Sequence, residues 1–223
     1  MYKQTIERLI REGYDFDMNR YIDRGYKIFS AKMGMFVGYA AIYFLISLIG
    51  ASGFGGLVSL VVRGPLIAGF FIVTNAIVRN EPVTFERFFE GFKIFLPLFL
   101  AELISQIFTG IGFVLLILPG IYLAVAYSFT VPFVTFLNMD FWEAMESSRK
   151  LITRNFWPFL GFFVILTLIN VLGVILLGVG LLFTFPATYC MVYAAFEDIV
   201  GNAIREDEVQ KQSQSDGTYY TYE

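Results

Sequence analysis

The stretch "LILPGIYLAVAYSFTVPF", residues 116–133, decides the fold class. It is too apolar for a loop and too long for a buried strand, yet it contains Pro119, Gly120 and Pro132. Proline removes a backbone hydrogen bond from a helix, and a helix inside a membrane tolerates this because neighbouring helices satisfy the freed carbonyl. The stretch therefore predicts a transmembrane helix that is interrupted in its most apolar part.

The composition of the whole chain agrees with this prediction. Of its 223 residues, 57% are hydrophobic and 18% aromatic, and the mean hydropathy is +0.67. Soluble domains are about 45–50% apolar by a count that includes glycine, whereas this chain has 20 glycines in addition. One cysteine (Cys190) and no histidine exclude an internal disulfide and argue against a zinc or haem site, so we expect no cofactor.

Six apolar segments are each close to the ~20 residues that cross a bilayer, although the third is short. Short glycine-rich turns at 50–56, 109–112 and 177–180 separate the members of each pair. We therefore predict an all-α polytopic membrane protein with a six-span domain over 17–202. A cytoplasmic segment (1–16) would precede it, and an acidic tail without periodicity (203–223) would be disordered. The six segments are 33–50, 57–78, 94–109, 113–137, 156–177 and 181–196.

The placement of positive charge predicts the orientation. Of 16 lysines and arginines, 15 lie in the N-terminal segment, in the loops 79–93 and 140–155, or in the tail, and only Arg63 lies inside a span. Lysine and arginine accumulate on the cytoplasmic side of membrane proteins. Both termini and both longer loops are therefore expected to be cytoplasmic.

Three amphipathic stretches precede the first, third and fifth spans. Asp140 with Glu143 forms a capping-box pattern before the third stretch, and Thr84 is a candidate N-cap for the second. Apolar residues on one helical face are typical of helices that lie in the headgroup plane; the alternative is that they simply extend the spans into the cytosol. The three faces are Met18, Ile22, Tyr26, Phe29 and Met33; Phe85, Phe88, Phe89, Phe92 and Leu96; and Phe141, Met145, Ser148, Ile152 and Phe156.

The same stretches indicate an internal repeat. "RGYKIF" (24–29), "EGFKIF" (90–95) and "SSRKLI" (147–152) align, and prolines 65, 119 and 186 fall early in the returning span of each unit. A period near 60 residues predicts three helical hairpins of one design. Kinks at Pro65, Pro119, Pro132 and Pro186 would splay the hairpins around a shared centre; alternatively the prolines only help spans of different length to pack.

Two opposite charges lie at membrane depth. Arg63 and Glu102 are six and about seven residues from the outer ends of their spans, which is ~10 Å at 1.5 Å per residue. An unpaired charge at the centre of a membrane helix costs ~2.5–3.5 kcal/mol, so we predict that they pair. The pair is either a functional gate, proton site or substrate contact, or a structural clasp. The amides Asn75, Gln106, Asn138 and Asn170 would join it or bridge helices.

No pattern in the sequence indicates an enzyme or binding of nucleic acid. A histidine-based triad is impossible, the spans lack carboxylates for a metal, and the glycines of 53–56 lack the context of a phosphate loop. The acids and bases of 140–154 alternate as on a solvated helix face. Arg149, Lys150 and Arg154 are the candidate surface there for anionic lipid or a protein partner.

Three stretches carry a family resemblance: "LPGIYLAVAYSFTVPF", "FWEAMESSRKLITRNFWPFLGFF" and "FPATYCMVYAAFEDI". Over about residues 18–200 the chain resembles a loosely related group of bacterial six-span proteins of unknown function. That group is similar to the membrane domain fused to some glycerophosphodiester phosphodiesterases. The resemblance implies a bacterial inner-membrane protein, and it implies no catalytic residues because the phosphodiesterase chemistry belongs to a separate domain.

Two functions fit the sequence. The first is a non-enzymatic membrane component that organises lipid or docks a partner at the cytoplasmic face. The second is a small-solute transporter or channel with a proline-kinked bundle around Arg63 and Glu102. The scarcity of polar groups in the spans favours the first, because transporters usually have more polar lining and discontinuous helices.

The charge distribution gives a direct test of topology. Reporter fusions at Gly55, Gly110 and Gly178 should report the outside, and fusions at Glu81 and Asp140 should report the cytoplasm. The reverse pattern at either set of positions would show that the charge argument is wrong.

Overall fold

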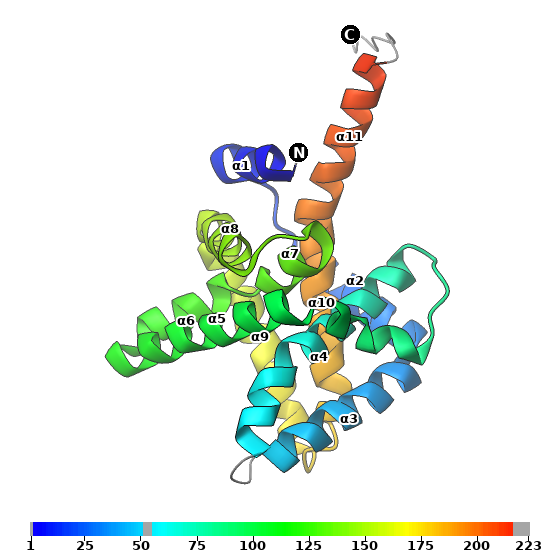
Figure 1. Ribbon diagram of the computed structural model, residues 1–223, viewed down its shortest axis with the longest axis vertical. Helices are drawn as coiled ribbons and strands as arrows, with labels where there is room; N and C mark the ends of the chain where they lie inside the picture. The colour runs from blue at the N-terminus through cyan, green and yellow to red at the C-terminus, as the bar shows by residue number, and fades with distance from the viewer. Residues whose placement is uncertain (1, 51–54, 216–223) are drawn as a thin grey trace.

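The computed structural model describes residues 2–50 and 55–215, and the regular secondary structure of this part of the chain is all helical (Figure 1). One element (η1) is a 3₁₀ helix and one (η2) is a π-helix. In chain order the elements are α1 (Tyr2–Glu12), α2 (Met18–Ala31), α3 (Met33–Gly50), α4 (Gly55–Val78), η1 (Phe85–Ile94), α5 (Phe95–Leu115), α6 (Ile117–Ala126), α7 (Thr130–Leu137), α8 (Phe141–Arg154), α9 (Phe156–Ile175), α10 (Leu181–Phe196), η2 (Glu197–Gly201) and α11 (Asn202–Ser215).

The structure confirms an all-helical membrane protein, with fewer clear spans than the sequence predicts. Among the described residues, four helical stretches are long and apolar enough to cross a membrane, and α2 with α3 makes a fifth if that pair, bent by 91°, is one span. At 16 residues, α10 is shorter than a typical span. The four stretches are Val58–Val78, Phe85–Leu115, Ile117–Leu137 and Phe156–Ile175.

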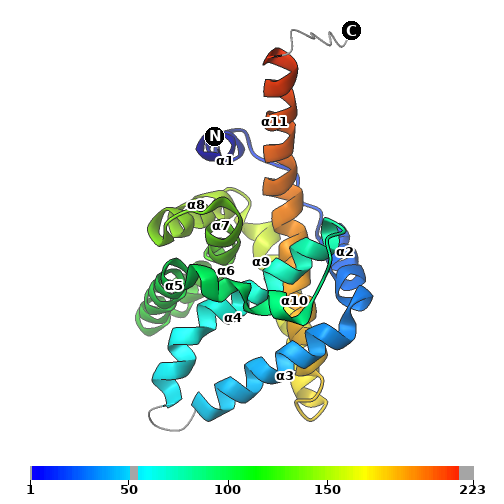
Figure 2. The same ribbon diagram turned by 45° about the vertical axis from the view of Figure 1, so that its right-hand side comes forward.

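Helix α10 is the centre of the fold. It packs against α2, α3, α4 and α9, and every residue from Cys190 to Phe196 is buried. A helix that is apolar on all sides must be covered on all sides. Around it α3, α4 and α9 run toward one end of the molecule, whereas the hairpin of α5 and α6 extends sideways (Figures 1 and 2).

The break inside the most apolar stretch is at residues 127–129, between α6 and α7. The buried hydroxyl of Ser148, on α8, donates to the carbonyl of Ala126 (2.6 Å) and accepts from the amide of Phe129 (3.1 Å). A backbone group freed inside a bilayer needs such a partner, since no water replaces the lost bond. Ser148 therefore stabilises the interruption.

The prolines do not cause this break. Pro119 and Pro132 each occupy the third position of a helix, α6 and α7, where the missing N–H has no intrahelical acceptor. The prediction of a kink at these two positions is therefore wrong. Pro65 and Pro186 do lie inside α4 and α10.

One predicted glycine turn is also misplaced. Helix α5 continues through 109–112 and ends at Leu115, because Gly112 packs against Gly120 of α6: a Cβ on Gly112 would lie 3.0 Å from the Gly120 Cα. The turn at 177–180 is correct, with Leu177 and Gly178 at positive φ (57° and 76°). Of the first turn, residues 51–54 lie outside the described residues.

The first amphipathic stretch forms α2, but its buried face differs from the prediction. The buried residues include Tyr21, Gly25 and Ile28. Tyr26 and Met33 were expected on the apolar face, but they are 56% and 36% exposed. The face shifts because Gly25 allows α2 to lie directly against α10. The angle of 91° to α3 shows that α2 does not simply continue that helix.

The third stretch forms α8 as predicted. The carboxylate of Asp140 accepts from the amides of Trp142 and Glu143, and Met145 and Ile152 are buried. In the second stretch Phe88 is buried and stacks on Tyr39, with ring centroids 4.3 Å apart. Thr84 makes no capping hydrogen bond, so that part of the prediction is wrong.

The C-terminal tail is helical over a larger part than expected. Residues 203–215 of the predicted disordered tail belong to α11, and residues 2–12 form α1. Asp207 explains the docking of these two helices, because it accepts from the hydroxyl of Thr5 (2.6 Å) and pairs with Arg8 (2.9 Å). The arginine, glutamate and glutamine content of α11 also favours a helix.

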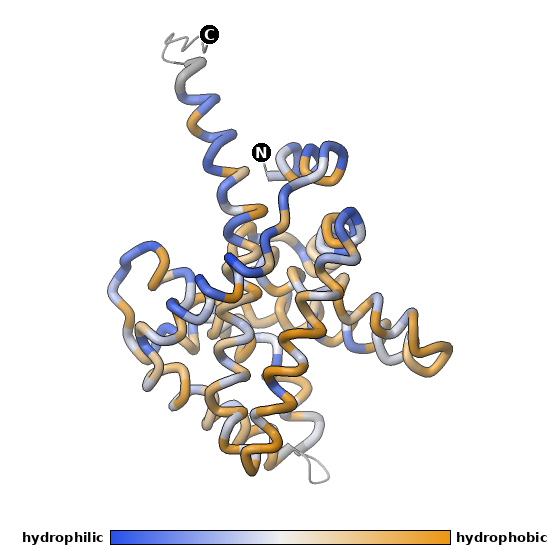
Figure 3. Tube along the Cα trace, turned by 180° about the vertical axis from the view of Figure 1, so that it is seen from behind, coloured by the Kyte–Doolittle hydropathy of each residue, from blue (hydrophilic) through white to orange (hydrophobic). Residues whose placement is uncertain are grey.

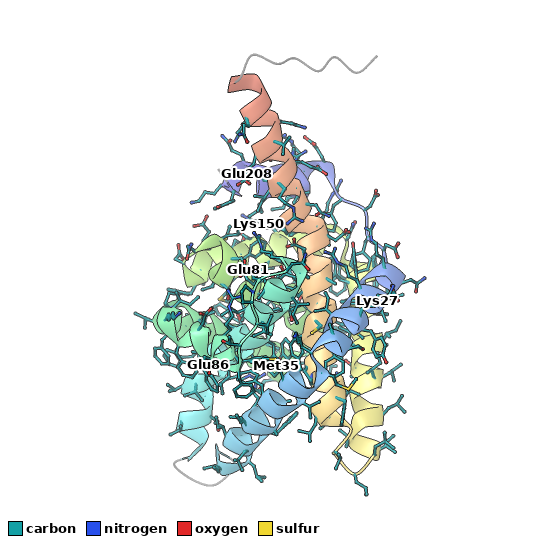
Figure 4. All side chains as sticks on the ribbon, turned by 90° about the vertical axis from the view of Figure 1, so that its right-hand side faces the viewer. Lys27, Met35, Glu81, Glu86, Lys150 and Glu208 are labelled. Atoms are coloured by element: carbon teal, nitrogen blue, oxygen red, sulfur yellow. The ribbon has the colours of Figure 1, made fainter. Side chains whose placement is uncertain are left out.

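Polar and apolar residues separate along the long axis. Hydrophilic residues gather at the end that carries both termini, and hydrophobic ones at the opposite end and at the tip of the α5–α6 hairpin (Figure 3). Compared with Met35, four labelled charged residues lie nearer the end that carries the termini: Lys27, Glu81, Lys150 and Glu208 (Figure 4). This division is typical of a protein with one end in lipid and the other in water.

The contact of α2 with α10 gives a prediction. In Gly25→Ala the new Cβ would lie 2.4 Å from the Cα of Met191, so the helices must separate. We expect a loss of about 1–3 kcal/mol of unfolding free energy, seen as a lower melting temperature in detergent. Gly34→Ala is the control, because nothing lies within 4 Å of its Cβ position. Equal melting temperatures would contradict this packing.

Candidate functional site

A cavity of about 500 Å³ lies between α4, α5, α9, α10 and the break that separates α6 from α7. Arg63 and Glu102 both line it, and so do Tyr127 and Ser128 from the break itself. Cavities of roughly 300–1,000 Å³ are typical of small-molecule sites. The interrupted helix and the two intramembrane charges therefore belong to one site.

The structure brings the two predicted charges together. The Nε of Arg63 lies 2.8 Å from Oε1 of Glu102, and the same oxygen accepts from the Nε2 of Gln106 at 3.0 Å. The Glu102 side chain is 14% exposed and that of Arg63 is 45% exposed. Helix α5 presents Glu102 and Gln106 one turn apart toward α4. The pair is thus buried on the acid side and accessible on the arginine side.

A second cavity, of about 270 Å³, adjoins the same arginine. Tyr43, Ser47 and Ser59 of α3 and α4 line it, together with Arg63 and Gln106. The Ser47 and Ser59 hydroxyls bond backbone carbonyls. Arg63 and Gln106 therefore line both cavities.

Two hydroxyls in the larger cavity have no protein partner. The Oγ atoms of Ser105 and Ser128 are buried without a hydrogen bond in the described part of the chain, and both residues line the cavity. Leaving a buried hydroxyl unpaired costs about 1–3 kcal/mol. The hydroxyls of Thr130, Thr135 and Thr184, which do not line the cavity, are also buried without a partner, so this feature does not by itself mark a ligand site.

The remaining predicted amides bridge helices or end them. Asn75 accepts from the hydroxyl of Tyr193 on α10 at 2.6 Å. Asn170 on α9 donates to the Thr188 hydroxyl on α10 at 2.7 Å. Asn138 ends α7 in the left-handed conformation, with φ of 51°. Of the four predicted amides, Gln106 is the one that joins the charge pair.

A separate polar network holds the helix of the C-terminal region. Glu197, on η2, is 3% exposed, and its carboxylate accepts from Tyr193 (3.2 Å) and pairs with Arg205. Asp198 next to it pairs with Arg20 of α2. These acids have partners, so we assign this network to fixing α11 rather than to a ligand.

The predicted cytoplasmic surface is partly neutralised within the protein. The Nε and Nη2 atoms of Arg149 each donate to the carboxylate of Glu146 at 2.8 Å. The Nζ of Lys150 lies 3.3 Å from the same carboxylate. The hydrogen bond and charge of Arg149, with Lys150, lower the pKa of Glu146 to about 2. Arg154 is exposed and lies beside α1 near Gly13. Arg149 and Lys150 are therefore less available to an anionic lipid than the sequence indicates.

The residues that sequence reasoning missed carried a readable signal. On α5 Glu102, Ser105, Gln106 and Thr109 follow one another at helical spacing, a polar stripe on an apolar helix, and all four line the cavity. Tyr127 and Ser128, by contrast, are placed there by the break between α6 and α7. Only the structure shows that the break faces the stripe.

Within residues 2–50 and 55–215 no cluster of three or more His, Cys, Asp or Glu residues is arranged to hold a metal ion. Cys190 is buried and lies 3.4 Å from the hydroxyl of Thr74. The chemistry that the site offers is accordingly one guanidinium, one carboxylate, an amide and several hydroxyls. These groups can bind and orient a polar molecule.

No family of known proteins, no curated protein and no solved structure matches the chain. The link to the membrane domain of glycerophosphodiester phosphodiesterases therefore stays a prediction. The function is argued below from the geometry of the site.

The charge pair gives a second prediction. Arg63→Ala and Glu102→Ala should each lower the unfolding free energy by about 2 kcal/mol, because each leaves an uncompensated charge; the exposure of Arg63 reduces the effect below that of a fully buried pair. The double variant should lose less than the sum, by about 1 kcal/mol. Chemical denaturation in detergent measures all three. Additive losses would show that the two charges act separately.

Proposed function

We propose that this chain is a small-solute transporter that binds its solute in the cavity of Arg63 and Glu102. The observation that carries the proposal is that the Arg63–Glu102 ion pair lines a cavity of about 500 Å³ together with the break between α6 and α7. A clasp between helices needs the ion pair alone. It does not need a cavity of ligand size beside the pair.

The broken helix supports the same function. Binding sites of many transporters are formed by discontinuous helices near the middle of the membrane, where irregular backbone is tolerated because it lines a cavity. The break between α6 and α7 contributes Tyr127 and Ser128 to the cavity wall. Its backbone hydrogen bonds to Ser148 stabilise the break.

The two cavities suggest a route for the solute. Arg63 and Gln106 line both of them, so a change in the Arg63–Glu102 contact would connect or separate the two spaces. In this proposal the ion pair is the gate. The smaller cavity, lined by Ser47 and Ser59, is the side nearer the turn between α3 and α4.

We further propose that the protein has six spans in the bacterial inner membrane, with both termini in the cytoplasm and three units of one design. The order of elements supports the repeat, because an amphipathic helix (α2, η1 or α8) three times precedes a pair of apolar segments. The charged end that carries both termini supports the orientation. The resemblance to bacterial six-span proteins supports the location.

Organisation of lipid or docking of a partner at the cytoplasmic face is a second candidate function. It is favoured by the exposed aromatic side chains of Trp142 on α8 and of Trp157, which is 77% exposed, at the start of α9. Tryptophan is typical of the headgroup level. Arg154 is the exposed cation that this function would use, since Glu146 binds Arg149 and Lys150.

Native mass spectrometry of the protein in nanodiscs separates the two functions. We expect a bound soluble metabolite that is at least ~10-fold depleted in Arg63→Gln, which corresponds to about 1.4 kcal/mol. Arg154→Gln, a matched change outside the cavity, should retain it. Bound anionic lipid or protein that depends on Arg149, Lys150 or Arg154, with no metabolite, would contradict the transporter and support the second function.

A further inference from the structure

We infer that the cavity ligand is a zwitterion, with its ammonium group at Glu102 and its carboxylate or phosphate at Arg63. This inference rests on the proposed function and names the ligand class of the same site. It follows from which hydrogen-bonding atoms of the two charged side chains are occupied and which are not.

The ion pair uses only part of each side chain. Its contact joins Nε of Arg63 to Oε1 of Glu102, and Gln106 donates to the same Oε1. A guanidinium has five N–H donors and a carboxylate has about four acceptor sites. Outside this pair, the terminal nitrogens of Arg63 and Oε2 of Glu102 make no hydrogen bond to the part of the chain that the structure describes. An anion and a cation can therefore bind side by side, each next to the opposite charge.

Charge balance argues against ligands with one net charge. Arg63 and Glu102 are the charged residues that line the cavity, and their charges cancel. A ligand with one net charge would bring an uncompensated charge into a low-dielectric site, at a cost of several kcal/mol. A zwitterion keeps the site neutral and places each of its charges beside the opposite one.

The rest of the lining defines the ligand further. Thr109 and Tyr127 add hydroxyl-bearing side chains to the lining, and a hydroxyl can donate to the anionic group. Ile67, Phe71 and Phe163 supply apolar surface on other sides. The ligand therefore combines a compact zwitterion with a short apolar part. Two sources share this chemistry: a free α-amino acid with an apolar side chain, and the headgroup of an ethanolamine phospholipid.

The test compares ligands that differ by one charge, on the full-length wild-type chain purified in detergent. The probes are L-valine, 3-methylbutanoate (valine without its amine), 2-methylpropylamine (valine without its carboxylate) and glycerophosphoethanolamine, whose phosphodiester matches that of the lipid headgroup. Equilibrium dialysis at millimolar concentrations measures binding. We expect at least one of the two zwitterions to bind at least ~10-fold tighter than either singly charged analogue, since each loses one ion contact.

Variants then assign each charge to its residue. Glu102→Gln should weaken binding of the zwitterion at least ~10-fold, whereas binding of 3-methylbutanoate should be no weaker. Arg63→Gln should also weaken binding of the zwitterion at least ~10-fold, whereas binding of 2-methylpropylamine should be no weaker. Arg154→Gln should change neither. Preference for L-valine indicates a free amino acid. Preference for glycerophosphoethanolamine, with retention of phosphatidylethanolamine over phosphatidylglycerol in mixed nanodiscs, indicates the lipid headgroup.

The outcomes separate the two proposals. Valine and one singly charged analogue could bind equally well, and Arg63→Gln or Glu102→Gln could abolish that binding. This result would overturn the inference of a zwitterionic ligand but would still support a ligand-binding cavity. Binding of none of the four probes would overturn the zwitterion as well, and the native mass spectrum then decides whether the cavity binds another solute. Because the comparison of probes uses the wild-type protein, it holds even if a variant does not fold.

Discussion

The rest of the structure depends on the two hydrogen bonds by which Ser148 holds the break between α6 and α7. A helix interrupted inside a bilayer is stable only if its freed backbone groups find partners in the protein. Because the partner comes from α8, this helix must lie against the break, and Ala144, Met145 and Leu151 are buried there. The same interruption places Tyr127 and Ser128 in the cavity wall. One buried serine thus links a helix outside the spans to the candidate site within them.

The sequence predicted those features that depend on local chemistry or on the cost of burying charge. The all-helical membrane class followed from composition, the start of α8 from Asp140, and the contact of Arg63 with Glu102 from the cost of an isolated charge in lipid. Features that depend on which surfaces meet were not predictable. The buried face of α2 follows from the approach of Gly25 to Met191, and the helical state of residues 203–215 follows from contacts such as Asp207 with Arg8.

Proline shows why a local signal can mislead. Within an apolar stretch of sequence, a proline in the first turn of a helix cannot be distinguished from a proline that bends a helix. Pro119 and Pro132 begin α6 and α7, where no backbone bond is lost, whereas Pro65 and Pro186 lie within helices. What distinguishes them is the end of the preceding helix. For α6 that end is set by the packing of Gly112 on Gly120, which brings α5 and α6 together as a hairpin.

An ion pair inside a membrane protein is a costly way to join two helices, since packed apolar side chains often serve as well. It has an advantage if the contact must open. A zwitterion can replace the contact between Arg63 and Glu102 while each charge keeps an opposite charge beside it, so opening needs no uncompensated charge at any stage. Gln106 can remain bonded to Glu102 throughout and hold the carboxylate in place. The exposure of Arg63, three times that of Glu102, makes the arginine the partner that moves. In the proposed transporter, a neutral exchange of this kind would open the contact between the two cavities only for a ligand that carries both charges.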